Sequence, residues 1–307
     1  MTYNQLWKRL TVIYNEREAQ AIVRTVLDAL FGMSLTDICL GKVTQLSADD
    51  TTRLEKIMQR LEKSEPVQYV LGAEWFAGRL FDVAPGVLIP RPETEDLVKW
   101  ACDEAKEKED NSKEERGKEE KEVPKKGEEA PHPSILDIGT GSGCIAITVA
   151  LALPQARVTA WDISTDALAI AAGNAHRLGA SVRFEHQDAL SAPDDEERWD
   201  VIVSNPPYIC DRERADMSDN VLSYEPELAL FVPDSDPLLF YRAIARYASK
   251  ALKPGGRLLF ETNTAYAHEV AQAMANEGFT AIEVRNDCFG KPRMVKGSFF
   301  KGKKVKR

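Results

Sequence analysis

The stretch Trp199-Asp200-Val201-Ile202-Val203 runs directly into Ser204-Asn205-Pro206-Pro207-Tyr208-Ile209. Its first half is short, apolar and β-branched, which is typical of an inner strand of a parallel sheet. Asn205 therefore follows the end of a central strand, and ligands of α/β proteins bind at that edge of the sheet. The two prolines fix the backbone and remove two N–H donors. We expect a rigid rim of hydrogen-bond acceptors there.

The predicted rim suits a planar NH2 group, on an amide or an aromatic amine, whose conjugated lone pair makes it a poor nucleophile. The side-chain oxygen of Asn205 and the carbonyl of Pro206 can accept its two protons while a new bond forms, so no titratable base is required. Tyr208 can stack on the same group. The alternative interpretation is a simple turn after a core strand, because short motifs give false positives.

A second motif lies upstream. Ser134-Ile135-Leu136-Asp137-Ile138 predicts a buried strand, and Gly139-Thr140-Gly141-Ser142-Gly143 predicts a turn into an apolar helix over residues 144–153. The glycines allow the backbone to approach a ligand, and the helix N-terminus offers unpaired N–H groups. The next strand, residues 157–162, ends in Asp162, where a carboxylate can accept hydrogen bonds from both hydroxyls of a ribose.

This order of strand, glycine turn, helix, strand and acid indicates an adenosyl cofactor. A dinucleotide site also has glycines and an acid, but the five-residue turn with Asp137 just ahead of it favours S-adenosylmethionine, whose product is S-adenosylhomocysteine. Gln187-Asp188-Ala189 follows a predicted strand over 182–186, and we expect it to meet the adenine, with Asp188 accepting the exocyclic amine. A loop cap is the alternative role for Asp188.

Patterns along the chain divide it into four parts. Residues 1–65 form a helical module whose role is to hold a partner, with Gly32 and Ser47 as expected helix caps. Residues 66–102 form a β-hairpin and a linking segment. Residues 103–133 are a charged insert that we expect to be disordered, its early part extending the preceding helix through pairs such as Glu104–Lys108. Residues 134–300 form the α/β domain, in which residues 211–236 suggest a functional loop.

The linking segment contains Leu88-Ile89-Pro90-Arg91-Pro92-Glu93-Thr94-Glu95. Its prolines favour an extended backbone, and Thr94 is the expected cap of a helix that begins near Glu95. Arg91 and Glu93 either bind a ligand or only stabilise the start of that helix.

Composition narrows the class of protein. The net charge of −9 argues against general affinity for nucleic acids, so we expect no direct nucleic-acid binding. The five cysteines form no CxxC pair, which indicates a reduced cytoplasmic protein without a metal site. The first ten residues lack the apolar core of a signal peptide, and the longest apolar run is too short to span a bilayer. No membrane partner is expected.

Taken together, these motifs resemble the protein-(glutamine-N5) methyltransferases that modify peptide chain release factors. The resemblance covers most of the chain from about residue 66 to residue 299, outside the charged insert. The glycine turn and Asn-Pro-Pro-Tyr occur in many methyltransferases, whereas Ile-Pro-Arg-Pro-Glu-Thr-Glu in this order is specific. The residues that carry the resemblance are 66–72, 88–95, 135–143 and 205–209.

The resemblance implies an α/β fold, namely a seven-stranded, Rossmann-like class I S-adenosylmethionine-dependent methyltransferase domain with a small N-terminal helical substrate-binding domain and a linking β-hairpin. It implies transfer of a methyl group to the glutamine side chain in the Gly-Gly-Gln motif of release factors, the expected partners. The implied cofactor-binding residues are Gly139, Thr140, Gly141, Ser142, Gly143, Asp162, Asp188, Ala189 and Asn205. The implied substrate-binding residues are Asn205, Pro206, Pro207, Tyr208, Arg91 and Glu93, with Asn205, Pro206 and Tyr208 as the catalytic ones.

The sequence departs from the family pattern at Ala189, where an aromatic residue is often found, and at Asn263 and Tyr266, which replace Gly and Gln. Three other functions use the same motifs. Glutamine methylation of a ribosomal protein is chemically identical. Adenine-N6 methylation of DNA would require a basic DNA-binding region, and the net charge of −9 argues against one. A cofactor-binding scaffold without catalysis would not need an intact Asn-Pro-Pro-Tyr motif.

Overall fold

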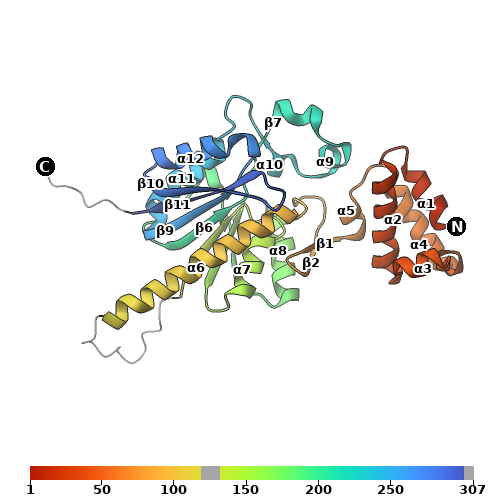
Figure 1. The fold of residues 1–307 in the computed structure, drawn as a ribbon, viewed down its shortest axis with the longest axis horizontal. Coiled ribbons are helices and arrows are strands. Elements are labelled where there is room, and N and C mark those ends of the chain that lie inside the picture. The colour runs from red at the N-terminus through yellow and green to blue at the C-terminus, as the bar shows by residue number, and fades with distance from the viewer. Residues whose placement is uncertain (119–131, 301–307) are drawn as a thin grey trace.

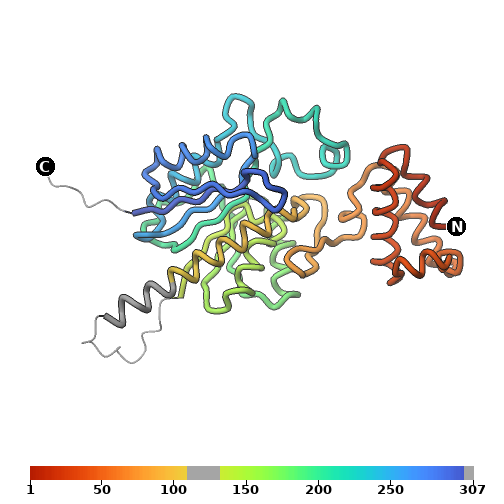
Figure 2. The backbone as a smooth tube through the Cα atoms, viewed as in Figure 1, coloured from red at the N-terminus to blue at the C-terminus, as the bar shows by residue number. Residues whose placement is uncertain are grey.

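A computed structural model describes residues 1–118 and 132–300 of the chain. Figure 1 shows a group of helices at one end, a sheet covered by helices at the other, and a small hairpin between them. The chain path in Figure 2 makes the same division visible. The first group comprises α1 Tyr3–Leu10, α2 Glu16–Phe31, α3 Leu35–Cys39, the 3-10 turn η1 Lys42–Gln45, and α4 Ala48–Leu61.

The helical group has its own apolar core. Leu6, Val23, Leu27 and Leu54 are among the fully buried side chains that the amphipathic helices turn towards one another. The predicted caps are confirmed, because Gly32 ends α2 in a left-handed conformation and the Ser47 side chain accepts a hydrogen bond from the third residue of α4. The pattern of residues 1–65 therefore predicted these helices correctly.

The linking segment starts with a short helix, α5 Val67–Leu71, and continues into the antiparallel hairpin of β1 Ala73–Phe76 and β2 Arg79–Asp82. The fully buried Asn174 ties this hairpin to the α/β domain. Its side chain accepts from the Asp82 N–H at 2.7 Å and donates to the Asp82 carbonyl at 2.9 Å and to the Ser142 carbonyl at 3.0 Å. The hairpin is thus held against the glycine turn by hydrogen bonds.

Among the described residues, the main sheet has seven strands in the order β10-β11-β9-β6-β3-β4-β5. Strands β9, β6, β3, β4 and β5 are parallel, and β11 is antiparallel to both β9 and β10. Strand β6 lies at the centre, as predicted, and the chain reverses its direction across the sheet between β3 and β6. The strands are β3 Ser134–Ile138, β4 Arg157–Asp162, β5 Val182–His186, β6 Trp199–Ser204, β9 Leu252–Glu261, β10 Phe279–Asn286 and β11 Pro292–Phe299.

Helices cover both faces of the sheet (Figure 1). Val201 and Val203 pack in the core with α6 and α7, whereas Ile202 between them packs with α11 and α12. This alternation follows from the period of a strand, and Val201, Ile202 and Val203 are all apolar because both faces of β6 are buried there. The helices are α6 Pro92–Lys118, α7 Cys144–Ala152, α8 Thr165–Leu178, α11 Leu239–Ala251 and α12 Ala267–Asn276.

Short elements make up the rest of the α/β domain, mostly in the predicted functional loop. They are η2 Ala189–Ser191, β7 Ile209–Cys210, η3 Asp211–Asp216, α9 Asp219–Tyr224, α10 Glu227–Leu230, β8 Phe231–Val232 and η4 Thr264–Tyr266. Within residues 1–118 and 132–300, no helix is long and apolar enough to cross a membrane.

Helix α6 differs from the sequence prediction at its start. It begins at Pro92, so Thr94 lies inside its first turn and does not cap it. It continues to Lys118, so the early part of the insert over 103–133 extends the helix, as predicted. The reason is packing, since Ala105 is fully buried and Glu104 forms ion pairs with Arg257 and Lys296 of the sheet. Residues 119–131 of the predicted insert lie outside the described residues.

Candidate functional site

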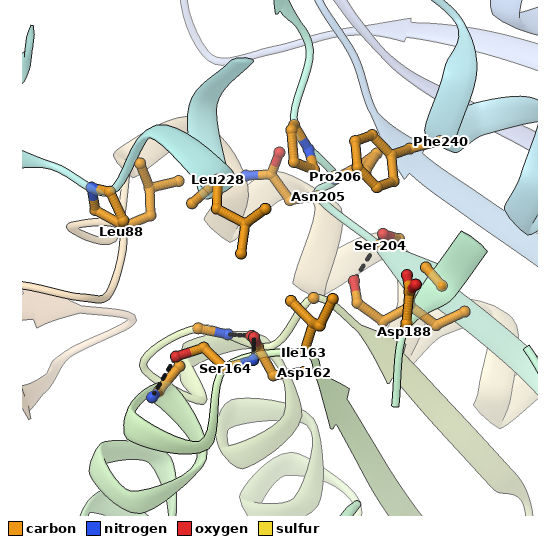
Figure 3. A pocket seen from close by; sticks show the side chains of 18 of the residues that line it. Leu88, Asp162, Ile163, Ser164, Asp188, Ser204, Asn205, Pro206, Leu228 and Phe240 are labelled. Atoms are coloured by element: carbon orange, nitrogen blue, oxygen red, sulfur yellow. Dashed lines mark hydrogen bonds between the residues drawn. The ribbon is translucent and has the colours of Figure 1, made fainter. Parts of the chain in front are cut away.

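A cavity of about 310 Å³ opens where β3, β4 and β6 end. This is the edge at which the chain reverses its direction across the sheet, the usual ligand site of such folds. In Figure 3, Asp162 and Ser164 lie on one side of the cavity, with Asn205, Pro206 and Leu228 opposite. Its wall is formed by Gly86, Val87, Leu88, Ile138, Gly139, Gly141, Asp162, Ile163, Ser164, Ala167, Gln187, Asp188, Ala189, Leu190, Ser204, Asn205, Pro206, Pro207, Pro226, Leu228, Ala229, Phe240 and Ile244.

The glycine turn after β3 contributes backbone to this wall. Gly139 and Gly141 have φ angles of +77° and +54°, and a Cβ atom at either position would enter open space within the cavity. The turn is held to β4 because the Trp161 carbonyl accepts from the N–H groups of Gly139 and Thr140, both at 2.9 Å. The result is a concave backbone surface that a ligand can approach closely.

Three predicted cofactor-binding residues of this turn do not line the cavity. Thr140 and Ser142 are buried, and the Thr140 hydroxyl donates to the Asp137 carboxylate at 2.6 Å. Gly143 instead packs tightly on α7 and α8, where an added Cβ would lie 2.7 Å from Ile147 and 3.0 Å from Ala171. These three residues therefore shape the turn from behind, through the Thr140–Asp137 hydrogen bond and the close packing of Gly143.

Asp137 lies directly beneath the turn and is fully buried. One carboxylate oxygen also accepts from the Ala146 N–H at 3.2 Å, while the other has no hydrogen-bond partner in the part of the chain that the structure describes. Burial raises the pKa of Asp137 to about 7. Through its hydrogen bonds with Thr140 and Ala146, Asp137 stabilises the turn and the start of α7.

Asp162, at the end of β4, has the position that the sequence predicted. Its two carboxylate oxygens accept from the N–H groups of Gly141, at 2.8 Å, and Ser164, at 2.9 Å. These bonds fix the side chain at the cavity wall and still leave lone pairs on both oxygens. Asp162 can thus accept further hydrogen bonds from a ligand.

Asp188 and Ala189 follow β5 and also line the cavity. The Asp188 carboxylate caps the short turn η2, accepting from the Leu190 N–H at 2.8 Å and from the Ser191 hydroxyl at 3.3 Å. The two roles weighed for Asp188 are therefore compatible, since a capping carboxylate has lone pairs left over. Ala189 leaves space where a larger side chain would narrow the cavity.

The Asn205-Pro206-Pro207 rim lies at the end of β6, and all three residues line the cavity. The preceding Ser204 donates its hydroxyl proton to the Ile138 carbonyl at 2.7 Å, which ties the rim to β3. The Asn205 amide donates through Nδ2 to Thr94 Oγ1 at 3.4 Å. Its Oδ1 atom is buried and has no hydrogen-bond partner among residues 1–118 and 132–300. Such an atom is an acceptor ready for a ligand.

Tyr208 does not line this cavity, although the sequence placed it in the site. Its ring packs against the core that contains Tyr241 and Phe260, and burial raises its pKa. Its N–H donates to the Leu230 carbonyl at 3.2 Å, and its own carbonyl accepts from Asn263 at 3.4 Å. Tyr208 therefore supports the rim from behind, because the Pro-Pro turn carries it past the cavity.

Arg91 and Glu93 also lie outside the cavity wall. Arg91 pairs with Glu225 at 2.6 Å, and the Glu225 side chain is almost completely buried, so its charge needs this partner. Glu225 accepts a second bond from the Ile89 N–H at 3.1 Å. Glu93 is only partly buried, at the second position of α6. Arg91 thus fastens the functional loop to the linking segment.

Sequence reasoning missed two parts of the wall that come from distant segments. Gly86, Val87 and Leu88 come from the linking segment, and Pro226, Leu228 and Ala229 come from the functional loop. In Figure 3, Leu88 lies across the cavity from Ser164. The clue to the first was its proximity to the Ile-Pro-Arg-Pro motif. The sequence signal for the second was the apolar Leu228 within the predicted functional loop; in the structure this side chain is exposed.

A buried carboxyl group was also missed. Glu261, at the end of β9, is 1% exposed and accepts from the Thr94 hydroxyl at 2.6 Å. Burial raises its pKa to about 7. The available signal was an acid at the end of the apolar strand, beside β6.

Comparison with known proteins agrees with the fold. A family model described as "PrmC N-terminal domain" matches residues 4–72, and one described as "Methyltransferase small domain" matches residues 124–223. A protein of Bacteroides thetaiotaomicron named release factor glutamine methyltransferase is 44% identical over 284 residues, which cover 92% of this chain and 94% of that protein. A protein of the same name from Flavobacterium psychrophilum is 37% identical over 96% of this chain and 97% of its own length.

Proposed function

Because the chain belongs to the release factor glutamine methyltransferase family, we propose that it methylates the side-chain amide nitrogen, N5, of the glutamine in the Gly-Gly-Gln motif of peptide chain release factors. It is an S-adenosylmethionine-dependent methyltransferase. Its proposed place of action is the cytoplasm, where release factors serve translation. The observation that carries the proposal is the buried, unpaired Oδ1 of Asn205 at the cavity wall.

The residues present fit the cofactor. The side-chain-free backbone of Gly139 and Gly141 leaves room for it, and Asp162 keeps lone pairs that would accept bonds from the ribose hydroxyls. Asp188 would accept the adenine amine beside Ala189. When bound, S-adenosylmethionine supplies an electrophilic methyl group on a sulfonium sulfur.

The substrate amide would bind at the rim. Asn205 Oδ1 would accept one proton of the glutamine NH2 group and the Pro206 carbonyl the other. Both acceptors polarise the N–H bonds and return electron density to nitrogen as its lone pair attacks, and they require no rearrangement during the reaction. Rigidity follows from Pro206 and Pro207, and Tyr208 would hold the turn in place. We assign Asn205 and Pro206 as the residues that contact the reacting amide.

The helical group over residues 1–65 would hold the body of the release factor. It has its own core, and it is joined to the α/β domain by the linking segment and by the Tyr224 hydroxyl, which donates to the Lys63 carbonyl at 2.7 Å. Directly after this group, the Tyr69 hydroxyl of α5 donates to the carbonyl of Val87 in the cavity wall at 2.5 Å, so the chain leads from the helical group to the site. The domain therefore suits recognition of a protein substrate.

Labelled S-adenosylmethionine incubated with purified release factor, ribosomal proteins or DNA tests the proposal. We expect label in the release factor alone, and none in a release factor whose Gly-Gly-Gln glutamine is replaced. Label in a ribosomal protein or in DNA instead would select one of the alternative functions.

A further inference from the structure

Three side chains from distant parts of the sequence meet behind the rim. They are Thr94 in the first turn of α6, Asn205 after β6, and Glu261 at the end of β9. Thr94 Oγ1 donates to Glu261 Oε2 at 2.6 Å, and Asn205 Nδ2 donates to Thr94 Oγ1 at 3.4 Å. Thr94 and Glu261 are 2% and 1% exposed. Because Thr94 and Glu261 are buried from water, the hydrogen-bonding groups of the three side chains must pair with one another.

The chemistry of these groups determines the direction of the hydrogen bonds. An ionised carboxylate only accepts, and a threonine hydroxyl has a single proton. Because Thr94 gives its proton to Glu261, its remaining lone pairs can only accept. The group that faces Thr94 from Asn205 must therefore be the NH2 end of the amide. Asn205 also lowers the pKa of the Glu261 carboxyl, as the NH2 end of an amide near a carboxylate does.

The opposite end of the amide, Oδ1, is buried and unpaired within the described part of the chain, and Asn205 lies at the cavity wall, so a substrate bound there could supply its missing partner. If the Asn205 amide turned by half a rotation, its NH2 group would face the NH2 group of the substrate and could accept nothing from it. An asparagine side chain alone does not select between these two orientations. Its neighbours must do so.

We propose that Thr94 and Glu261 are positioning residues that keep the carbonyl end of the Asn205 amide turned towards the substrate. This inference rests on the proposed function, because it assumes that the substrate presents an NH2 group at the rim. It also gives a role to the Ile-Pro-Arg-Pro-Glu-Thr-Glu motif. Arg91 and Glu95 anchor this segment through Glu225 and the Ala77 N–H, and Thr94 between them reaches the site.

Protonation of Glu261 reverses the chain of hydrogen bonds. A neutral Glu261 can donate to Thr94, and the Thr94 proton is then free for Asn205 Oδ1. Burial raises the pKa of Glu261 to about 7, while Thr94, Arg293 and Asn205 oppose that shift. The ionisable groups around it are Arg293, Glu93, Tyr208, Tyr241 and Cys144. Activity should therefore fall between pH 8 and pH 6.

The test compares single-turnover methyl transfer to a release factor, at saturating cofactor, for the unaltered enzyme and for Thr94→Val, Thr94→Ser, Glu261→Gln and Thr148→Val. Thr148→Val is the matched control, since it removes a buried hydroxyl that has no hydrogen-bond partner in the described part of the chain. Cofactor affinity and thermal unfolding are measured for each variant. Thr94→Val should lower kcat about tenfold, the scale of one hydrogen bond, with the KM for release factor and cofactor affinity within about twofold.

Thr94→Ser should keep both the rate and its fall at acid pH, and Thr148→Val should match the unaltered enzyme. Glu261→Gln cannot ionise, so its kcat should be flat from pH 6 to pH 8. A Thr94→Val enzyme with full kcat, or an acid loss that persists in Glu261→Gln, would overturn the inference and leave the proposed function intact. No transfer by the unaltered enzyme would overturn both.

Discussion

Two turns that follow the neighbouring strands β3 and β6 line the same cavity but differ in composition. The turn after β3 is glycine-rich, lacks side chains at Gly139 and Gly141, and presents backbone. The turn after β6 is proline-rich, lacks N–H groups at Pro206 and Pro207, and presents acceptors. The glycine turn leaves space for a ligand, and the proline turn presents rigid hydrogen-bond acceptors.

With these two turns, one edge of the sheet can bind two ligands. A cofactor needs a close-fitting backbone and a carboxylate for its hydroxyls, which the first turn and Asp162 provide. A substrate amide needs fixed acceptors for its two protons, which Asn205 and Pro206 provide. Variants of the two turns should therefore affect different steps: cofactor binding for the first turn and methyl transfer for the second.

The largest effect is expected at Asn205. Asn205→Ala removes the acceptor and should lower kcat by about 10²–10³, as the loss of a preorganised hydrogen-bonding group does elsewhere. Cofactor affinity should stay within about twofold, since Asn205 faces the substrate. Single-turnover transfer and calorimetric titration of the cofactor measure the two quantities separately. Similar losses in kcat and in cofactor affinity would show that Asn205 binds the cofactor and not the substrate.

The next effect concerns Asp162. Asp162→Ala should weaken cofactor binding by about 2–3 kcal/mol, the scale of hydrogen bonds to a charged group, because it removes the proposed ribose acceptor. The rate at saturating cofactor should change little. The matched control is Asp166→Ala on the exposed side of α8, for which titration should show unchanged affinity. An Asp162→Ala protein that binds like the control would locate the ribose elsewhere.

A smaller effect is expected behind the glycine turn. Gly143 has a φ angle of +82°, and an added Cβ would lie 2.7 Å from Ile147. Gly143→Ala should therefore lower the free energy of unfolding by about 1–3 kcal/mol. Gly173→Ala, inside α8 with open space around it, should instead raise stability by about 0.5–1 kcal/mol. Denaturant titration of both proteins measures the contrast, and equal stabilities would show that Gly143 tolerates a side chain.

The smallest effect is expected at Tyr208. Its ring packs in the core and supports the rim, so Tyr208→Phe should change kcat by about twofold or less, the low end of one hydrogen bond. A loss of tenfold or more in the same single-turnover assay would show that the hydroxyl takes part in the reaction.

Much of the fold was predictable because local patterns determine it. The apolar run of β6, the helical periodicity before residue 65 and the caps at Gly32 and Ser47 all act over a few residues. The extension of α6 into the charged insert was predicted in the same way, from pairs such as Glu104–Lys108. The ion pairs of Glu104 with Arg257 and Lys296 were not predictable, because partners so distant in sequence leave no local signal.

The candidate site divides in the same way. Asp162, Asp188 and Asn205 were predictable because the carboxyl ends of parallel strands meet at one edge. Arg91 was predicted to bind a ligand or to stabilise the start of a helix, and its ion pair with Glu225, 134 residues away, could not be predicted from spacing. The contact between Thr94 and Glu261 spans 167 residues and depends on how α6 crosses the sheet. Contacts of this kind follow from tertiary packing and not from spacing.

The most direct test of the central claim is to locate the transferred methyl group by tandem mass spectrometry of a release factor treated with the enzyme and S-adenosylmethionine. We predict a single methyl group on the side-chain nitrogen of the Gly-Gly-Gln glutamine, and its loss when Asn205→Ala replaces the unaltered enzyme. A methyl group on any other residue, or full modification by Asn205→Ala, would contradict the proposed role of the rim.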